Sequence, residues 1–157
     1  MNHTLDDPAD RIGYLLWQTA HLVNREMSAA LQPFGITPAQ FGALVHTGRE
    51  PGVSAAELAR RINLTPQSIQ TALRPLIERT WMERRPHPVH RRVLGNFLTE
   101  DGLTATQEAS SAVTTADARL SAAFDRAEQE QFTNYVRRAL LALNPTALDR
   151  SSLRRQT

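Results

Sequence analysis

The segment from Ser54 to Arg79, "SAAELARRINLTPQSIQTALRPLIER", constrains the fold of this chain more than any other. Ser54 fits the N-cap of a short helix, and Thr65 followed by Pro66 fits the N-cap and first position of the next helix. The small side chain of Ala59 allows the two helices to approach closely, and Leu64 fills the corner of the turn between them. The spacing therefore predicts a helix-turn-helix motif.

The second helix of this motif has two chemically different faces. Its apolar positions recur at helical spacing, at Ile69, Leu73, Leu76 and Ile77. Its outer face is polar, and such side chains can bond to base edges and phosphates, while the helix N-terminus itself favours a phosphate. An ordinary amphipathic helix with a solvated face would show the same periodicity. The next segment of the chain favours the first interpretation, because it is basic.

Immediately after this helix come two short β-like runs, "WMERRP" and "RRVLGNFL", joined by "HPVH". They predict a β-hairpin with a short tip. All 18 basic side chains are arginine, and residues 49–100 carry nine of them against five acids. Residues 1–48 carry two arginines against four acids, and residues 101–157 carry seven against seven. The positive middle favours an anion-facing module, although charge alone is also compatible with an ordinary solvated surface.

The flanking segments predict further helices. The first extends from Pro8 to Gln32, and the second begins at Thr37 with a capping box closed by Gln40. A long polar helix is expected after Thr99, followed by a final helix over residues 127–143 that Asn144-Pro145 ends. The predicted fold class is mainly α with a small β-hairpin.

Composition excludes several classes of protein. The chain has no cysteine, so thiol chemistry and zinc-finger sites are excluded. It contains no uninterrupted apolar run of about 18 residues, and its acidic, polar start lacks a signal region, so no membrane contact and a cytoplasmic location are expected. We find no serine nucleophile motif, glycine-rich phosphate loop or paired carboxylates, and we expect neither enzymatic activity nor a cofactor.

From about Ile12 to Leu143 the chain resembles the MarR family of bacterial transcription regulators. The block from "VSAAELARRINLTPQ" to "LTEDG" matches the family's winged helix-turn-helix in order and spacing. "LTEDG" resembles the family's "LTEEG", and "ITPAQFGAL" resembles its second-helix opening. The resemblance implies a homodimer joined by residues 1–35 and 101–144 and a winged helix-turn-helix DNA-binding region at 36–100. It also implies a small-molecule effector pocket between the dimer and DNA-binding parts. The residues after the last helix, 145–157, are expected to form a flexible tail.

The resemblance also indicates which residues are expected to contact DNA. The recognition helix would enter the major groove, and an arginine of the wing would enter the minor groove. The expected recognition-helix contacts are Thr65, Gln67, Ser68, Gln70, Thr71 and Arg74. The expected wing contacts are Arg84 and Arg85 on phosphates, and His90, Arg91 and Arg92 at the tip, with Arg92 in the minor groove.

Two positions depart from the family pattern. The family's wing tip resembles Asp-Arg-Arg, whereas this chain has His90-Arg91-Arg92, so the acid that would orient Arg92 is missing. Protonation of His90 at mildly acidic pH would add positive charge near phosphate. Thr80 stands where the family usually has glycine, which costs about 1 kcal/mol if the position is left-handed.

The predicted function is a sequence-specific, homodimeric repressor that binds a pseudo-palindromic operator and is released by an effector. Trp17 and His21, four residues apart on the first helix, are candidates for the effector pocket, and a core or dimer-interface pair is the alternative. Other possibilities are a helical interaction module that no longer binds DNA, and a metal- or proton-responsive regulator that uses His87 and His90. With no cysteine and no evident third ligand, no metal site is expected.

Overall fold

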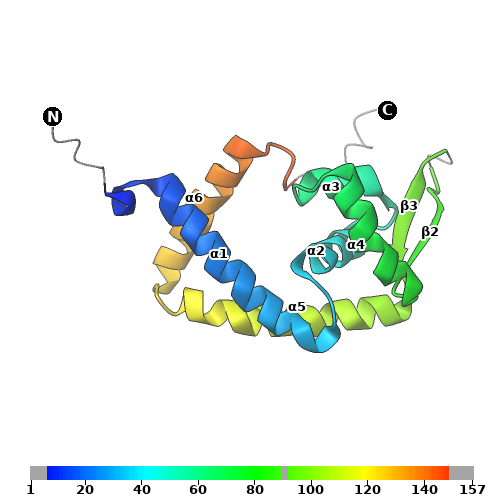
Figure 1. Ribbon diagram of the computed structural model, residues 1–157, viewed down its shortest axis with the longest axis horizontal. Coiled ribbons are helices and arrows are strands. Elements are labelled where there is room, and N and C mark those ends of the chain that lie inside the picture. Colours follow the sequence, from blue (N-terminus) through cyan, green and yellow to red (C-terminus); the bar gives the residue numbers. More distant parts are fainter. Residues whose placement is uncertain (1–6, 90–91, 149–157) are drawn as a thin grey trace.

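A computed structural model describes residues 7–89 and 92–148. Figure 1 shows the elements in chain order. They are η1 (Pro8–Asp10), α1 (Ile12–Leu31), η2 (Gln32–Phe34), α2 (Pro38–Arg49), β1 (Val53–Ser54), α3 (Ala55–Arg61), α4 (Pro66–Glu78), β2 (Met82–Pro86), β3 (Leu94–Leu98), α5 (Glu100–Ser121) and α6 (Arg126–Leu143).

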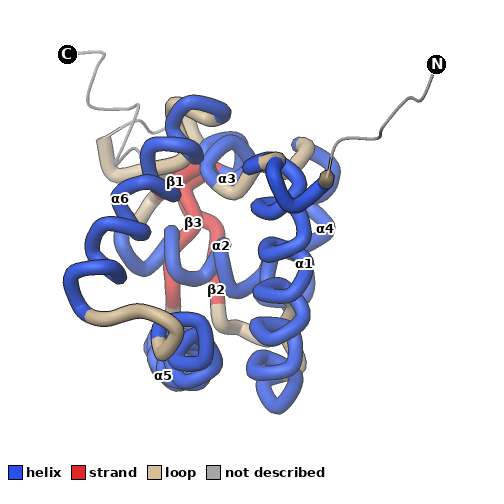
Figure 2. The backbone as a smooth tube through the Cα atoms, turned by 90° about the vertical axis from the view of Figure 1, so that its left-hand side faces the viewer, coloured by secondary structure: helices blue, strands red, loops and turns tan. Residues whose placement is uncertain are grey.

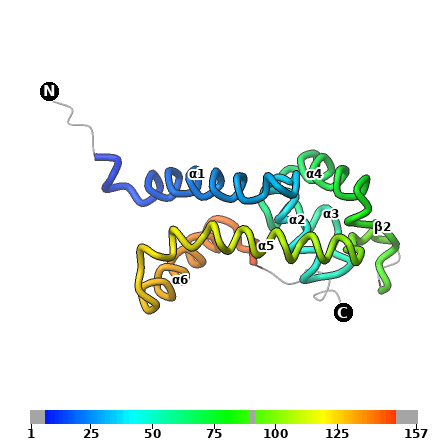
Figure 3. Tube along the Cα trace, turned by 90° about the horizontal axis from the view of Figure 1, so that it is seen from below, coloured from blue at the N-terminus to red at the C-terminus, as the bar shows by residue number. Residues whose placement is uncertain are grey.

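The molecule has a lobe at one end and long helices leading away from it. Helices α2, α3 and α4 pack together with the small sheet to form the lobe (Figures 1 and 2). Helices α1 and α5 lie side by side and extend from the lobe, and α6 lies toward their far ends (Figure 3). The predicted fold class, mainly α with a winged helix-turn-helix and a helical region beside it, is confirmed.

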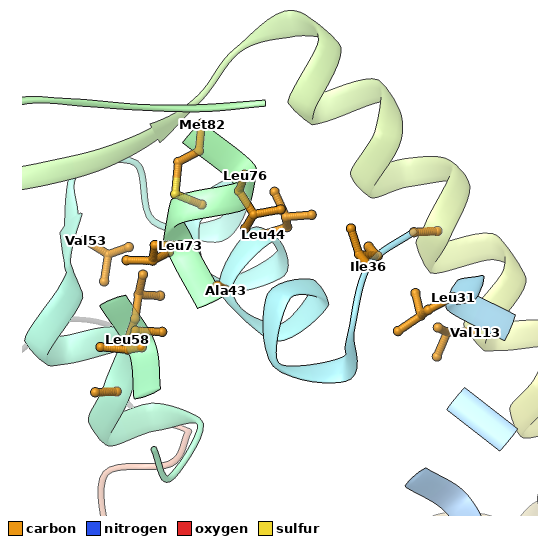
Figure 4. Close-up of a cluster of buried hydrophobic side chains, with 13 residues drawn as sticks. Leu31, Ile36, Ala43, Leu44, Val53, Leu58, Leu73, Leu76, Met82 and Val113 are labelled. Atoms are coloured by element: carbon orange, nitrogen blue, oxygen red, sulfur yellow. The ribbon is translucent and has the colours of Figure 1, made fainter. Parts of the chain in front are cut away.

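One buried apolar cluster connects these parts. Leu44, Leu58 and Leu73, from α2, α3 and α4, are fully buried in the lobe. The same cluster continues to Leu31 at the end of α1 and Val113 in the middle of α5 (Figure 4). Because this cluster spans both regions, the lobe is packed onto the long helices and not merely tethered to them.

The predicted helix starts are confirmed by their capping hydrogen bonds. The Thr37 side chain accepts from the Gln40 N–H while the Gln40 side chain accepts from the Thr37 N–H, a complete capping box. Thr65 caps α4 and Thr99 caps α5, each by accepting from a backbone N–H of the first turn. The expectation of one helix from Pro8 is wrong in detail, because Arg11 has an extended backbone that separates η1 from α1.

The sheet has three antiparallel strands in the order β1-β3-β2. The predicted hairpin pairs Met82 with Leu98 and Pro86 with Leu94. Strand β1, which pairs Val53 with Asn96, was not predicted, because two residues are too short to show a periodicity. Its approach to β3 requires glycine at position 95, where a Cβ would lie 2.6 Å from the carbonyl oxygen of Gly52.

The chain beyond α6 turns back toward the lobe. The side chain of Asn144 donates from Nδ2 to the carbonyl of Arg60, at 3.0 Å, at the end of α3. Ala147 is buried, with 5% of its surface exposed. The predicted tail begins at residue 145, and its part over residues 149–157 lies outside the described residues.

Helix α4 ends in a Schellman motif centred on Thr80. The Thr80 N–H donates to the carbonyl of Ile77 at 2.9 Å, and the Trp81 N–H donates to the carbonyl of Leu76 at 3.0 Å. Thr80 has a φ of 59°, so this position is left-handed. A threonine there carries the steric cost that the sequence pattern implied.

Replacing Thr80 with glycine is therefore expected to raise the free energy of unfolding by about 0.5–1 kcal/mol, because glycine adopts this backbone without a Cβ clash. Denaturant unfolding measures the difference. Thr115, which is exposed in the interior of α5, provides the control: the same substitution there should lower stability by about 0.3 kcal/mol, because glycine is a slightly poorer helix former than threonine. A Thr80→Gly variant less stable than the parent would contradict the prediction.

Candidate nucleic-acid interface

The outer face of α4 carries every residue predicted to contact DNA from this helix. The opposite face is fixed in the core by Ile69, Leu73 and Leu76, which are at most 1% exposed. This packing directs the polar face to solvent, and at the helix start the Ser68 N–H donates to the Thr65 hydroxyl at 3.0 Å. The exposed residues are Thr65, Gln67, Ser68, Gln70, Thr71 and Arg74.

Local hydrogen bonds order part of this face. The hydroxyls of Thr65 and Ser68 lie 2.8 Å apart, and the Thr71 hydroxyl donates to the carbonyl of Gln67 at 3.1 Å. Arg74 pairs with Glu78 through Nε and Oε1 at 2.8 Å, with both side chains largely exposed. An exposed ion pair of this kind contributes little to stability, so Glu78 does not hold Arg74 tightly.

The wing lies next to this face, and Arg84 joins the two. From β2, Arg84 donates from Nη2 to Oε1 of Gln70 at 2.6 Å and from Nε to Oδ1 of Asn96 at 3.2 Å. Asn96, on β3, is 1% exposed and donates from Nδ2 to the carbonyl of Val53 at 2.8 Å. The role of Asn96 was not predicted from the sequence. Its only signal was an amide within an otherwise apolar and glycine-containing strand.

Of the other predicted wing contacts, the structure describes Arg85 and Arg92. The guanidinium of Arg85 lies 4.0 Å from the centroid of the Phe97 ring and 3.5 Å from the Glu83 carboxylate. Arg92 is exposed where the chain leaves the tip. His90 and Arg91 lie outside the described residues, so the effect of His90 on Arg92 stays a prediction.

His87, the second histidine of the wing, packs against the turn at Gly52. Its Nδ1 accepts a hydrogen bond from the Val89 N–H at 3.2 Å. Among residues 7–89 and 92–148, no group of three histidine or carboxylate side chains is placed to hold a metal ion. The described geometry thus gives His87 a structural position in the wing.

A buried ion-pair cluster connects α3, the first helix of the helix-turn-helix, to the end of α2. The Arg61 side chain, 2% exposed, donates from Nε to Glu57 at 2.9 Å and from Nη2 to Glu50 at 2.8 Å. Glu57 also pairs with Arg60. Because Glu50 follows α2 and the other residues belong to α3, the cluster fixes the angle between these helices. The sequence suggested a capping box from Ser54 to Glu57, and Ser54 accepts from the Glu57 N–H at 3.2 Å, but no motif indicated that Glu50, Glu57 and Arg61 would pair.

His46, on α2, lies beside this cluster. Burial lowers the pKa of His46 below its ordinary value of 6.5, and the charges of Arg61 and Arg49 lower it further against a smaller opposing effect of Glu50. At neutral pH the imidazole is therefore largely uncharged in both the folded and the unfolded state. Below pH 6.5 the unfolded chain takes up a proton first.

Stability is accordingly expected to fall as the pH drops through 6.5 toward the lowered pKa of His46, because proton uptake favours the unfolded state. A His46→Gln variant should lose less stability than the parent over the same range. Urea unfolding at several values between about pH 5 and pH 8 measures the slope. Parallel slopes for the two proteins would show that His46 does not titrate as described.

The far end of the molecule exposes aromatic and aliphatic side chains. Trp17 is 56% exposed and its ring centroid lies 4.7 Å from that of His21 and 5.7 Å from that of Tyr14. Helix α6 buries none of its residues in the single chain. The exposed apolar residues of the two helices include Ile12, Leu15, Leu16, Leu22, Tyr135, Val136, Leu140 and Leu143. None of the described helices is long and apolar enough to cross a membrane.

A helix-turn-helix that turns a polar face to solvent, followed by an arginine-bearing hairpin beside that face, defines a winged helix-turn-helix protein. The comparisons with known proteins agree. The MarR family profile matches residues 34–93. The HTH-type transcriptional repressor Rv2887 of Mycobacterium tuberculosis is 36% identical over 121 residues, which is 77% of this chain and 87% of that protein. The chain belongs to the MarR family, as the sequence resemblance predicted.

Solved structures show the same fold. The M. tuberculosis MarR family protein Rv2887 in complex with DNA matches with a TM-score of 0.70 at 33% identity, over 82% of this chain and 97% of that one. Its complex with salicylic acid matches with a TM-score of 0.69 at 34% identity, over 82% and 96% of the two chains. CouR from Rhodococcus jostii RHA1, bound to p-coumaroyl-CoA, has a TM-score of 0.81 at 24% identity, over 94% and 99%, and shows the fold alone.

Proposed function

We propose that this chain is a cytoplasmic, non-enzymatic transcriptional repressor. Two copies bind a pseudo-palindromic operator with their recognition helices in successive major grooves, about one helical turn apart. The observation that carries the proposal is the continuous surface formed by the exposed face of α4 and the arginines of the wing. The complex of the relative Rv2887 with DNA supports it.

The unpartnered apolar residues of α1 and α6 support the homodimer. Leu143 is 87% exposed and Ile12 is 76% exposed, whereas α6 as a whole buries no residue. A helix with an apolar stripe needs a surface to cover it, and here the described part of the single chain does not supply one. A second copy would cover it and would place the two lobes on the same side of the DNA.

The effector part of the proposal concerns Trp17 and His21. Their rings are in contact and exposed on α1, at the end of the molecule where the second copy would pack. Aromatic rings with a nearby polar nitrogen suit a small planar acid. The relative Rv2887 has been crystallised with salicylic acid and with p-aminosalicylic acid.

Selection from a pool of randomised duplex DNA with the purified protein tests the proposal. We expect an enriched pseudo-palindrome. On that sequence, Arg92→Ala should weaken binding by about 1–3 kcal/mol and flatten the dependence of affinity on salt, because a minor-groove cation is lost. Arg126→Ala removes the same charge from the exposed start of α6 and should change neither quantity. Enrichment of no sequence would refute DNA recognition. Equal effects of the two variants would refute the wing contact.

A further inference from the structure

The buried amide of Asn96 has a fixed orientation. Asn96 pairs with Val53 of β1 on one side and with Arg84 of β2 on the other. Its Nδ2 donates to the carbonyl of Val53, and a carbonyl can only accept a hydrogen bond. The amide oxygen of Asn96 must therefore face β2, where it accepts from Nε of Arg84.

Arg84 links Asn96 to the recognition helix by hydrogen bonds to both Asn96 and Gln70. Nε of its guanidinium is engaged by Asn96, and Nη2 reaches Oε1 of Gln70 at 2.6 Å. A guanidinium has donors and no acceptor, so only the oxygen end of the Gln70 amide can face it. The NH₂ end of Gln70 then points away from Arg84, on the exposed face of α4.

A glutamine without such a partner can turn either end of its amide toward a base. It can also bind adenine with both ends, accepting from N6 and donating to N7. The contact to adenine needs Oε1 of Gln70 to face the base and accept from N6. Because Oε1 faces Arg84 instead, this two-bond contact is disfavoured. Donation from Nε2 to an acceptor remains open, and the base edges that offer one without a competing donor are guanine, with N7 and O6, and thymine, with O4.

We propose that Arg84, positioned by Asn96, sets the base preference of Gln70 by fixing its amide as a hydrogen-bond donor toward guanine or thymine. This inference rests on the proposed function. It makes Arg84 a positioning residue for sequence recognition, in addition to the phosphate contact expected from its place in the wing. Arg84 is exposed, so its replacement leaves the core intact.

The experiment compares the base preferences that four proteins select from randomised duplex DNA. Gln70→Ala identifies the position in each half-site whose preference depends on Gln70. At that position we expect the parent to enrich guanine or thymine, and Arg84→Met to shift the ratio toward adenine by about tenfold. Arg85→Met is the matched control: it removes the same charge from the neighbouring wing residue and should weaken overall binding while it preserves the base preference.

Base preference separates positioning from a merely structural or electrostatic role, because loss of a phosphate contact weakens all sequences alike. A parental preference for adenine at the Gln70 position, or identical preferences of the parent and Arg84→Met, would overturn the inference while leaving DNA recognition intact. A Gln70→Ala variant that alters no position would overturn it as well. Enrichment of no sequence by the parent would overturn the proposed function, and this inference with it.

Discussion

Replacing Gly102 with alanine is expected to lower the free energy of unfolding by about 3 kcal/mol, although alanine is ordinarily the better helix former. Gly102 lies in the first turn of α5, and a Cβ at this position would overlap the carbonyl oxygen of Trp81. That oxygen is backbone and accepts from the Thr99 N–H, while the Thr99 hydroxyl donates to the carbonyl of Thr80. The clash can be relieved only by moving the start of α5 away from the end of α4.

Gly13 provides the control for this substitution. It lies on the exposed first turn of α1, and a Cβ there would meet no atom within 4 Å. Gly13→Ala should therefore leave stability unchanged or raise it by up to about 1 kcal/mol. Thermal or urea unfolding of both variants measures the contrast. If Gly102→Ala were as stable as the parent, the close approach of α5 to Trp81 would be wrong.

Arg61→Met is expected to lower the free energy of unfolding by about 3 kcal/mol. Methionine retains most of the volume but removes the cation that faces Glu57 and Glu50. Breaking a buried pair by removing one partner costs about 3–5 kcal/mol because an uncompensated charge remains. The lower end applies here, since the Glu50 side chain is 22% exposed and Glu57 keeps Arg60 as a partner.

Two further variants make this prediction specific. Arg74→Met removes an arginine from a pair with Glu78 that is exposed on both sides, and should change stability far less than Arg61→Met does. Adding Glu57→Gln to Arg61→Met removes one of the two carboxylates that faced Arg61 and should recover part of the loss. A loss for Arg61→Met no larger than that for Arg74→Met would show that the cluster does not stabilise the lobe.

The start of helix α4 and its buried face could be predicted from the sequence pattern alone. The apolar residues of α4 recur at the spacing of one helical face, and the Thr65-Pro66 pair fixes where the helix begins. These two signals determine which side chains are buried, and hence that Gln67, Gln70 and Arg74 are exposed. The cost at Thr80 was predicted from the family resemblance, because the family usually has glycine at this helix end and glycine adopts a left-handed backbone without strain.

The tertiary contacts between elements could not be predicted from such local patterns. Strand β1 has only two residues, so it carries no periodicity, and it exists because β3 lies beside it. Arg61 and Glu50 are eleven residues apart, and Asn96 reaches Val53 across 43 positions of the chain. No local pattern encodes such pairs, because their partners are brought together only when the helices and strands pack.

The sequence by itself determined the order of the main helices and the wing hairpin, the caps of α2 to α5, the polar face of α4 and the family to which the chain belongs, because each depends on neighbours within a few residues or on a contiguous motif. Only the tertiary structure decided that Arg84 is held between Gln70 and Asn96, that Arg61 is buried among carboxylates, and that Gly102 lies against Trp81. These contacts depend on where one backbone segment meets another, and that distance is set by the packing of the whole lobe.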